Sequence, residues 1–269
     1  MRSIPIVTRN LLIINVVAFL AAKLFAGLDV TNYMFGLHYI EDPSFHLFQL
    51  VTYMFMHGSW EHIFFNMFAL WMFGCVVEKA WGTRRFLVYY LVCGVGAGLI
   101  QEVAQFVAWN YAQSSPGLTV GASGAIYAIL LAFGMTWPEN KIFIFPLPIP
   151  IKAKWFVCIY AAIELFLALN TTNDGVAHVA HLGGMIFGFL LIRHWQNGGQ
   201  LGMNFDVSGL FKNRTRKDRN QAHDERNKDW RYNEEKFSRE EIIDRILDKV
   251  RRNGYDSLTD EEKRTLFEK

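Results

Sequence analysis

A serine and a histidine lie in small-residue motifs on two different apolar segments of this chain. Ser123 follows Gly121 and Ala122 at the start of a short apolar stretch, and His181 lies early in a later one. An imidazole that accepts the proton of a serine hydroxyl turns the oxygen into a nucleophile. Together the two residues predict a serine protease that works inside a lipid bilayer.

Small residues favour the pairing of these two segments. Gly184 and Gly188 follow His181 at i+3 and i+7, so all three lie on one stripe of a helix. Gly124 directly follows Ser123, and alanines continue that segment. Small residues at such spacing let two helices approach closely in lipid. We therefore expect close packing to bring the serine oxygen to the histidine ring.

Two histidines of the later segment compete for the role of general base. His178 is expected nearer the outer surface, where a histidine commonly meets water. His181 heads the glycine stripe, so we predict that it is the base. Packing and hydrogen bonds must hold this imidazole in place. Tyr127, one turn after Ser123, is placed to stack against the ring.

A third polar group, His57, His62 and Asn66, has the spacing His-x4-His-x3-Asn. His62 and Asn66 are four residues apart and lie on one helix face. Polar residues in membrane spans either join helices or face a functional interior, and opposite a Ser–His pair we favour function. With Glu61 the histidines match neither the zinc-helix motif His-Glu-x-x-His nor its mirror image. We therefore predict no metal.

Charge divides the chain into two parts. Of 27 Lys and Arg and 25 Asp and Glu in 269 residues, 17 and 16 fall in residues 196–269. The first 195 residues keep only 10 basic and 9 acidic side chains, which indicates lipid as the solvent of the first part and water as the solvent of the last. The balanced charge of the last part argues against a nucleic-acid partner.

Six stretches approach the roughly 20 apolar residues that a membrane span needs. They are residues 10–26, 58–77, 86–107, 122–137, 155–170 and 177–195. The apolar run Ile142–Ile151 is excluded as a seventh span because its three prolines forbid a helix. The sequence thus predicts an all-α membrane protein with a six-helix transmembrane domain over residues 1–195. Within it, Glu102 and Glu164 have no assigned role.

Loop charges orient the predicted spans. Lys and Arg gather on the cytoplasmic side of a membrane. Basic residues precede the first span and occupy alternate connections, whereas the opposite loops carry acidic residues or none. The basic positions are Arg2, Arg9, Lys79, Arg84, Arg85, Lys141, Lys152, Lys154 and Arg193. Both termini are therefore predicted to be cytoplasmic, and the first span is expected to be an uncleaved helix, not a secretory signal. We expect a bacterial cytoplasmic membrane.

The chain resembles the rhomboid family of intramembrane serine proteases. The resemblance covers roughly residues 8–195. Its motifs are Thr52-Tyr53-Met54-Phe55-Met56-His57-Gly58, His62 to Asn66, Glu78-Lys79-Ala80-Trp81-Gly82, Gly121-Ala122-Ser123-Gly124 and Ala180-His181-x-x-Gly184-x3-Gly188. It implies six helices around a short fourth one, a Ser–His dyad without an aspartate, no cofactor, and cleavage of single-span membrane proteins near their outer ends.

The same resemblance implies roles for the remaining polar residues. Positions matching His62 and Asn66 form the oxyanion hole with the backbone N–H of Ser123, His57 supports them by hydrogen bonding, and Gly121 belongs to the serine motif. Two other classes stay open. A catalytically silent relative could bind or escort membrane proteins without cutting them. A transporter would show repeated halves or an ionisable pathway, and we find neither in the sequence.

The last part of the chain reads as a linker and a small helical tail. Residues 196–237 are rich in glycine and then in mixed charges, which is typical of a solvated, flexible segment. Residues 238–269 contain two capping boxes, Ser238-x-x-Glu241 and Thr259-x-x-Glu262, each followed by apolar residues. We expect a cytosolic helical hairpin, and docking of a cytosolic partner is one role open to it.

Overall fold

The structure is a computed structural model that describes residues 4–112, 115–144, 147–170 and 176–197, with Ile246, Lys249 and Thr259. The chain forms two compact units, one of residues 1–78 and 83–203 and the other of residues 79–82 and 204–269. The predicted linker and helical hairpin fall almost entirely outside the described residues, so both stay predictions.

Helices make up most of the described chain, and each predicted span overlaps one helical stretch. In the order of those spans, they are α1 (Ile6–Ala21) with the π-helical turn Ala22–Ala26; α4 (Trp60–Ala69), the π-helical turn Leu70–Gly74 and α5 (Cys75–Trp81); α6 (Thr83–Ala112); α7 (Ser123–Thr136); α8 (Ala153–Asn170); and α9 (His178–Gln196). Among the described residues, four stretches are long and apolar enough to cross a membrane: Ile6–Ala26, Trp60–Trp81, Thr83–Tyr111 and Ala153–Asn170. The apolar helix α7 is shorter.

A two-stranded hairpin corrects the expectation of an all-α fold. Strand β1 (Lys141–Ile144) pairs antiparallel with β2 (Leu147–Lys152), with Lys141 opposite Lys152. Proline removes the N–H that a helix needs, but a strand at the edge of a sheet tolerates it. The prolines that exclude a seventh span are therefore compatible with this hairpin. The described fold is mostly helical, not purely so.

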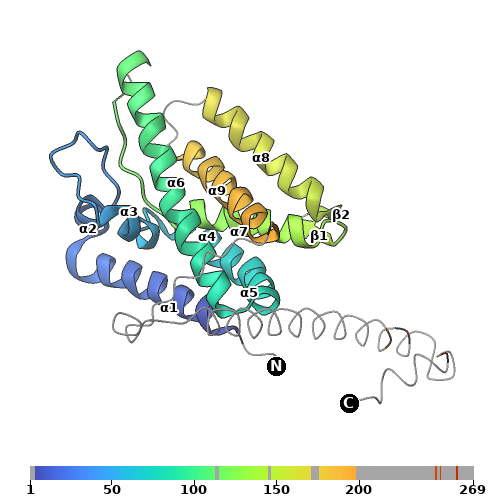
Figure 1. Cartoon of the computed structure of the whole chain (residues 1–269). Helices are drawn as coiled ribbons and strands as arrows, with labels where there is room; N and C mark the ends of the chain where they lie inside the picture. Colours follow the sequence, from blue (N-terminus) through green and yellow to red (C-terminus); the bar gives the residue numbers. More distant parts are fainter. Residues whose placement is uncertain are drawn as a thin grey trace, which may run out of the picture. The chain divides into compact units, whose positions relative to one another are not determined.

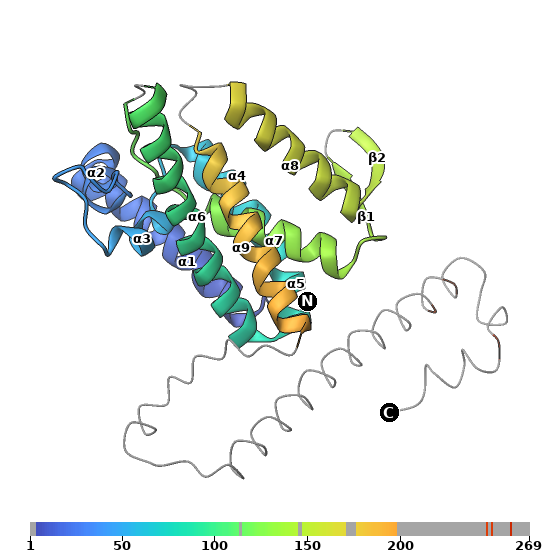
Figure 2. The same ribbon diagram turned by 45° about the horizontal axis from the view of Figure 1, so that its top comes forward.

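Helix α9 lies between α6 and α8 and packs along α7 (Figures 1 and 2). Glycines allow these helices to touch through their backbones. A Cβ atom on Gly184 would lie 1.9 Å from the carbonyl oxygen of Gly124, and one on Gly188 would lie 2.3 Å from the hydroxyl of Tyr89. No larger side chain fits at Gly184 without separating α7 from α9, so the close approach expected from the small residues is present.

A carboxylate distant in sequence caps the first helix. The backbone N–H groups of Val7 and Thr8 donate to Glu78 at 3.0 and 2.7 Å, and the Thr8 hydroxyl donates to the same carboxylate at 2.7 Å. The first N–H groups of a helix have no partner inside it, and a negative charge there is favourable. Glu78 therefore fixes the start of α1 against the segment that carries the Glu78-Lys79-Ala80-Trp81-Gly82 motif.

The connection between α1 and α4 contains three short helical pieces, α2 (Leu28–Phe35), α3 (Gln49–Thr52) and the 3-10 turn Tyr53–Phe55. It is hydrogen-bonded to the segment that leads into α7. Leu37 and Thr119 form an antiparallel bridge, and Gly121 donates its N–H to the Tyr53 carbonyl at 2.9 Å. These bonds fix the backbone immediately before Ser123.

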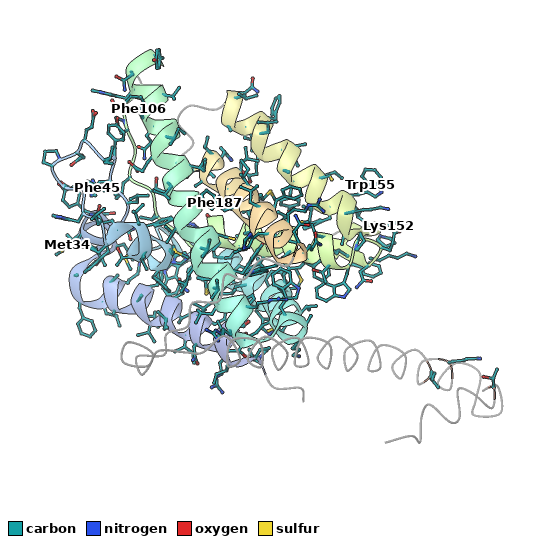
Figure 3. All side chains as sticks on the ribbon, viewed as in Figure 1. Met34, Phe45, Phe106, Lys152, Trp155 and Phe187 are labelled. Atoms are coloured by element: carbon teal, nitrogen blue, oxygen red, sulfur yellow. The ribbon has the colours of Figure 1, made fainter. Side chains whose placement is uncertain are left out.

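Large apolar side chains cover the outside of the helices (Figure 3). Phe106 and Trp155 are exposed, whereas Phe187 packs against Gly96 between α9 and α6. In water such a surface would be unfavourable, but around membrane-spanning helices lipid covers it.

Candidate active site

Ser123 begins α7, where the helix starts without a side-chain cap. Gly121 stands two residues earlier with φ of 124°, a conformation that L side chains rarely adopt. A Cβ atom on Gly121 would also lie 2.7 Å from Nε2 of His62. Glycine is therefore required at position 121 for two reasons: the backbone conformation and the lack of space beside the His62 ring.

The side chains of Ser123 and His181 meet between α7 and α9. Nε2 of His181 lies 2.8 Å from Oγ of Ser123, and the imidazole is buried. The ring of Tyr127 stacks on the imidazole with centroids 4.3 Å apart and planes 8° from parallel. This geometry suits transfer of the serine proton to Nε2, since a base must lie within about 2.6–3.2 Å of the group that it deprotonates.

An acidic group lies at the far side of the imidazole, which corrects the expectation, implied by the resemblance, of a dyad without an acidic third member. The carboxylate of Glu164, on α8, has Oε2 2.9 Å from Nδ1 of His181. The hydroxyl of Tyr127 donates to the other oxygen, Oε1. The sequence contained one signal for this role, because an ionisable residue inside an apolar span marks a functional site by default.

His178 also contacts this carboxylate, which corrects its predicted position in contact with water. Its side chain is buried, and its Nδ1 lies 2.6 Å from Oε2 of Glu164. The spacing of three residues places His178 and His181 on neighbouring parts of one helix face, and α8 covers that face. The helix register selected His181 for the serine, but it did not show that α8 would cover both rings.

The third polar group lies on α4 and just before it, and the ring of His62 is next to Gly121, two residues before Ser123. Gly58 donates its N–H to Nδ1 of His62 at 3.4 Å, so in the neutral ring the hydrogen sits on Nε2, the atom beside Gly121. Asn66 donates one amide hydrogen to the His62 carbonyl at 2.9 Å. A primary amide carries two hydrogens, so one is left over after this bond.

His57 is buried next to the His62 ring, with ring centroids 5.0 Å apart. Among the described residues neither ring nitrogen of His57 has a hydrogen-bond partner. Burial, and secondarily the neighbouring His62, lowers the pKa of His57 to about 3, so this ring is neutral. Its predicted part in hydrogen bonding stays a prediction.

Two groups of side chains contain residue types that bind metals. Glu61, the acid in the set excluded by its spacing, is exposed. Within the described part of the chain, Glu164, His178 and His181 could hold a metal ion, because their donor atoms lie within 4.8 Å of one another. The 2.6 and 2.9 Å separations from Nδ1 to Oε2 are, however, those of hydrogen bonds. Protons shared with the carboxylate account for this group.

Glu102 is the other buried acid whose role was open. Its Oε2 accepts the backbone N–H of Ile40 at 2.8 Å. Because Ile40 lies in the connection between α1 and α4, Glu102 joins α6 to that connection. The described hydrogen bonds of Glu102 involve neither Ser123 nor His181.

Comparison with known proteins identifies the family. A family model described as the Rhomboid domain matches residues 44–195, more than half of the chain. The chain belongs to the rhomboid family. A second model, a family of unknown function (DUF6576), matches residues 226–268. With its apolar helices, the rhomboid chain is a multi-pass membrane protein.

Three relatives illustrate the similarity. Rhomboid-like protein 11, chloroplastic, of Arabidopsis thaliana is 32% identical over 155 residues, which are 54% of this chain and 51% of the relative. Rhomboid protease AarA of Providencia stuartii is 29% identical over 147 residues, 51% and 52% of the two chains. The human presenilin-associated rhomboid-like protein, mitochondrial, is 29% identical over 153 residues, which are 53% of this chain and 38% of the relative. The chain thus spans about half the length, or less, of these relatives.

Proposed function

We propose that this rhomboid protein is an intramembrane serine endopeptidase in which Ser123 is the nucleophile and His181 the general base. The observation that carries the proposal is the 2.8 Å separation of Ser123 Oγ from His181 Nε2, with the imidazole buried between helices. Membership of a family that includes a protease, AarA, supports it.

The reaction then follows from the two side chains. His181 accepts the Ser123 proton at Nε2 while the serine oxygen attacks the carbonyl carbon of a substrate peptide bond. The tetrahedral intermediate collapses to an acyl-enzyme as the imidazolium returns that proton to the leaving amine. His181 next deprotonates a water molecule, which attacks the acyl carbon. The imidazolium then returns this proton to the Ser123 oxygen as the acyl bond breaks and the second product leaves.

Donors on the other side of Ser123 would stabilise the negative oxygen of the intermediate. We assign this role to the backbone N–H of Ser123, Nε2–H of His62 and the second amide hydrogen of Asn66, with His57 as their support. A helix N-terminus presents unpartnered N–H groups and a positive dipole end, which favours an anion there. Such preorganised donors act where charge develops and need no rearrangement during the reaction.

Substrate and topology belong to the same proposal. The substrates are single-span membrane proteins, cut near the outer face of the bilayer. Helices that contain Gly, Pro or Ser are cut more readily, because they unwind more easily than a uniform leucine helix. The protein has six spans with both termini cytoplasmic, in a bacterial inner membrane. Residues 1–195 form the protease domain, 196–237 the linker and 238–269 the helical tail.

Replacement of the nucleophile tests the proposal. The purified Ser123→Ala protein should be folded, should not cleave a single-span test substrate and should not react with a fluorophosphonate probe. The wild-type protein should do both. A wild-type protein that binds such a substrate but neither cleaves it nor reacts with the probe would be a catalytically silent escort. Appreciable cleavage by the Ser123→Ala variant would exclude Ser123 as the nucleophile.

A further inference from the structure

We propose that Glu164 is a positioning residue that holds His181 in its reactive tautomer and stabilises the imidazolium, so that the site works as a Ser–His–Glu triad. The proposal rests on the function proposed above and adds a residue to it. The carboxylate lies 2.9 Å from Nδ1 of His181, whose Nε2 lies 2.8 Å from the Ser123 hydroxyl.

The chain of hydrogen bonds allows one arrangement of protons at the imidazole. If the Ser123 hydroxyl donates to Nε2 of His181, the hydrogen of the neutral ring must be on Nδ1. Nδ1–H then points to a group that can only accept, the carboxylate of Glu164. The same tautomer leaves the lone pair of Nε2 free for the serine proton, as the proposed reaction requires.

The surroundings of Glu164 keep its carboxylate ionised. It receives three donors: Nδ1–H of His181 and Nδ1–H of His178 at Oε2, and the Tyr127 hydroxyl at Oε1. An ionised carboxylate accepts all three, whereas a protonated one would direct its own hydrogen at a donor. A buried charge is costly unless hydrogen bonds compensate for it. Here α7 supplies one of the three donors and α9 supplies the other two.

His178 and Tyr127 also have roles in this arrangement that a Ser–His dyad alone would not give them. His178 holds Oε2 in place beside the imidazole, and Tyr127 both stacks on His181 and fixes Oε1. When Nε2 of His181 takes the serine proton, the positive ring lies against a negative carboxylate that is already oriented. Glu164 itself takes no proton in this step.

Glu164→Gln removes the negative charge but keeps the size and shape of the side chain. The amide oxygen can accept from both histidines, and its NH2 group can donate to Tyr127, because a hydroxyl also accepts. The variant therefore keeps the hydrogen bonds and loses only the charge. An adjacent opposite charge favours the ionised form of a group by about 10- to 10³-fold. We expect kcat and the rate of probe labelling of Ser123 to fall by about that factor, with KM unchanged.

Glu102→Gln is the matched control. Glu102 is 8% exposed and Glu164 5%, and both lie in apolar helices, but Glu102 accepts only the Ile40 N–H among backbone donors. A glutamine oxygen can still accept that bond, so Glu102→Gln should keep the kcat of the wild type. A role of Glu164 in folding alone predicts wild-type kcat for Glu164→Gln as well, and that result would overturn the proposal.

Glu164→Asp and a chelator complete the test. Aspartate restores the charge on a shorter side chain, so its kcat should lie above that of Glu164→Gln and about tenfold below the wild type. If Glu164→Gln does not assemble, wild-type kcat in Glu164→Asp overturns the proposal. EDTA should leave wild-type cleavage unchanged, and its loss would assign Glu164, His178 and His181 to a metal instead. With Ser123→Ala inactive, each of these failures concerns Glu164 and leaves the proposed nucleophile standing.

Discussion

The two sides of Ser123 differ in how fully their polar groups are paired. On the side of α8 and α9, the carboxylate of Glu164 forms hydrogen bonds with His178, His181 and Tyr127. On the side of α4, the described hydrogen bonds of the His62 and Asn66 side chains go to nearby backbone, and the ring of His57 has no described partner. The first side has a carboxylate with three hydrogen-bond partners, whereas the second side has side chains with hydrogens left to donate.

This contrast fits the proposed function, because a serine protease has two different tasks at its serine. A base must keep one tautomer and one position before and after it takes a proton, so its surroundings should be saturated and rigid. An oxyanion exists only briefly, so its donors should be oriented but unused in the resting enzyme. In this rhomboid protein, polar groups without a described partner are therefore as informative about the site as paired ones.

The strongest way to break the comparison is to remove the base. His181→Ala should lower kcat by roughly 10³-fold or more and abolish probe labelling, because no other group would accept the Ser123 proton. His178→Gln retains an N–H donor for Glu164 and should keep kcat within about tenfold of the wild type. Cleavage assays in detergent, with probe labelling of the same samples, measure both. The reverse ranking of the two variants would mean that His178 is the base.

Asn66→Ala tests the unpaired side. Loss of one oxyanion donor typically lowers kcat by about 10²- to 10³-fold, and KM should change little because the donor acts in the transition state. Asn15→Ala is the control, since Asn15 is also buried in an apolar helix and donates to the carbonyl four residues before it, Leu11, at 2.8 Å. Steady-state kinetics decide. A raised KM with unchanged kcat in Asn66→Ala would show a structural bond and no more.

Gly184→Ala moves α9, which carries His181, away from α7, which carries Ser123, without removing a polar group. The added methyl would lie 1.9 Å from the Gly124 carbonyl oxygen, so α7 and α9 must move apart. A displacement of about 1 Å at reacting groups can cost about 10²-fold, and we expect such a fall in kcat with a lower Tm. Gly117→Ala, with no atom within 4 Å of the new Cβ, should change neither. Wild-type kcat in Gly184→Ala would show that close approach of these helices is not required.

Local patterns were sufficient to predict much of the site. Ser123 and His181 follow from their small-residue motifs, because glycines at i+3 and i+7 define a helix face that can touch another backbone. Tyr127 follows from its place one turn after Ser123. The apolar stretches follow from composition, and their helices begin and end within a few residues of the predicted spans.

The contacts of Glu164 were decided by the tertiary structure. Glu164 and His181 are 17 residues apart on different helices, and their bond depends on how α8 is rotated and shifted along α9. Glu78 likewise caps α1 across about 70 residues, and the partner of Ile40 lies in α6. The sequence by itself determined which helix faces are smooth or polar, because that depends on spacing within one helix. Which polar residues meet across helices was decided only by packing, because it depends on side chains throughout the interface.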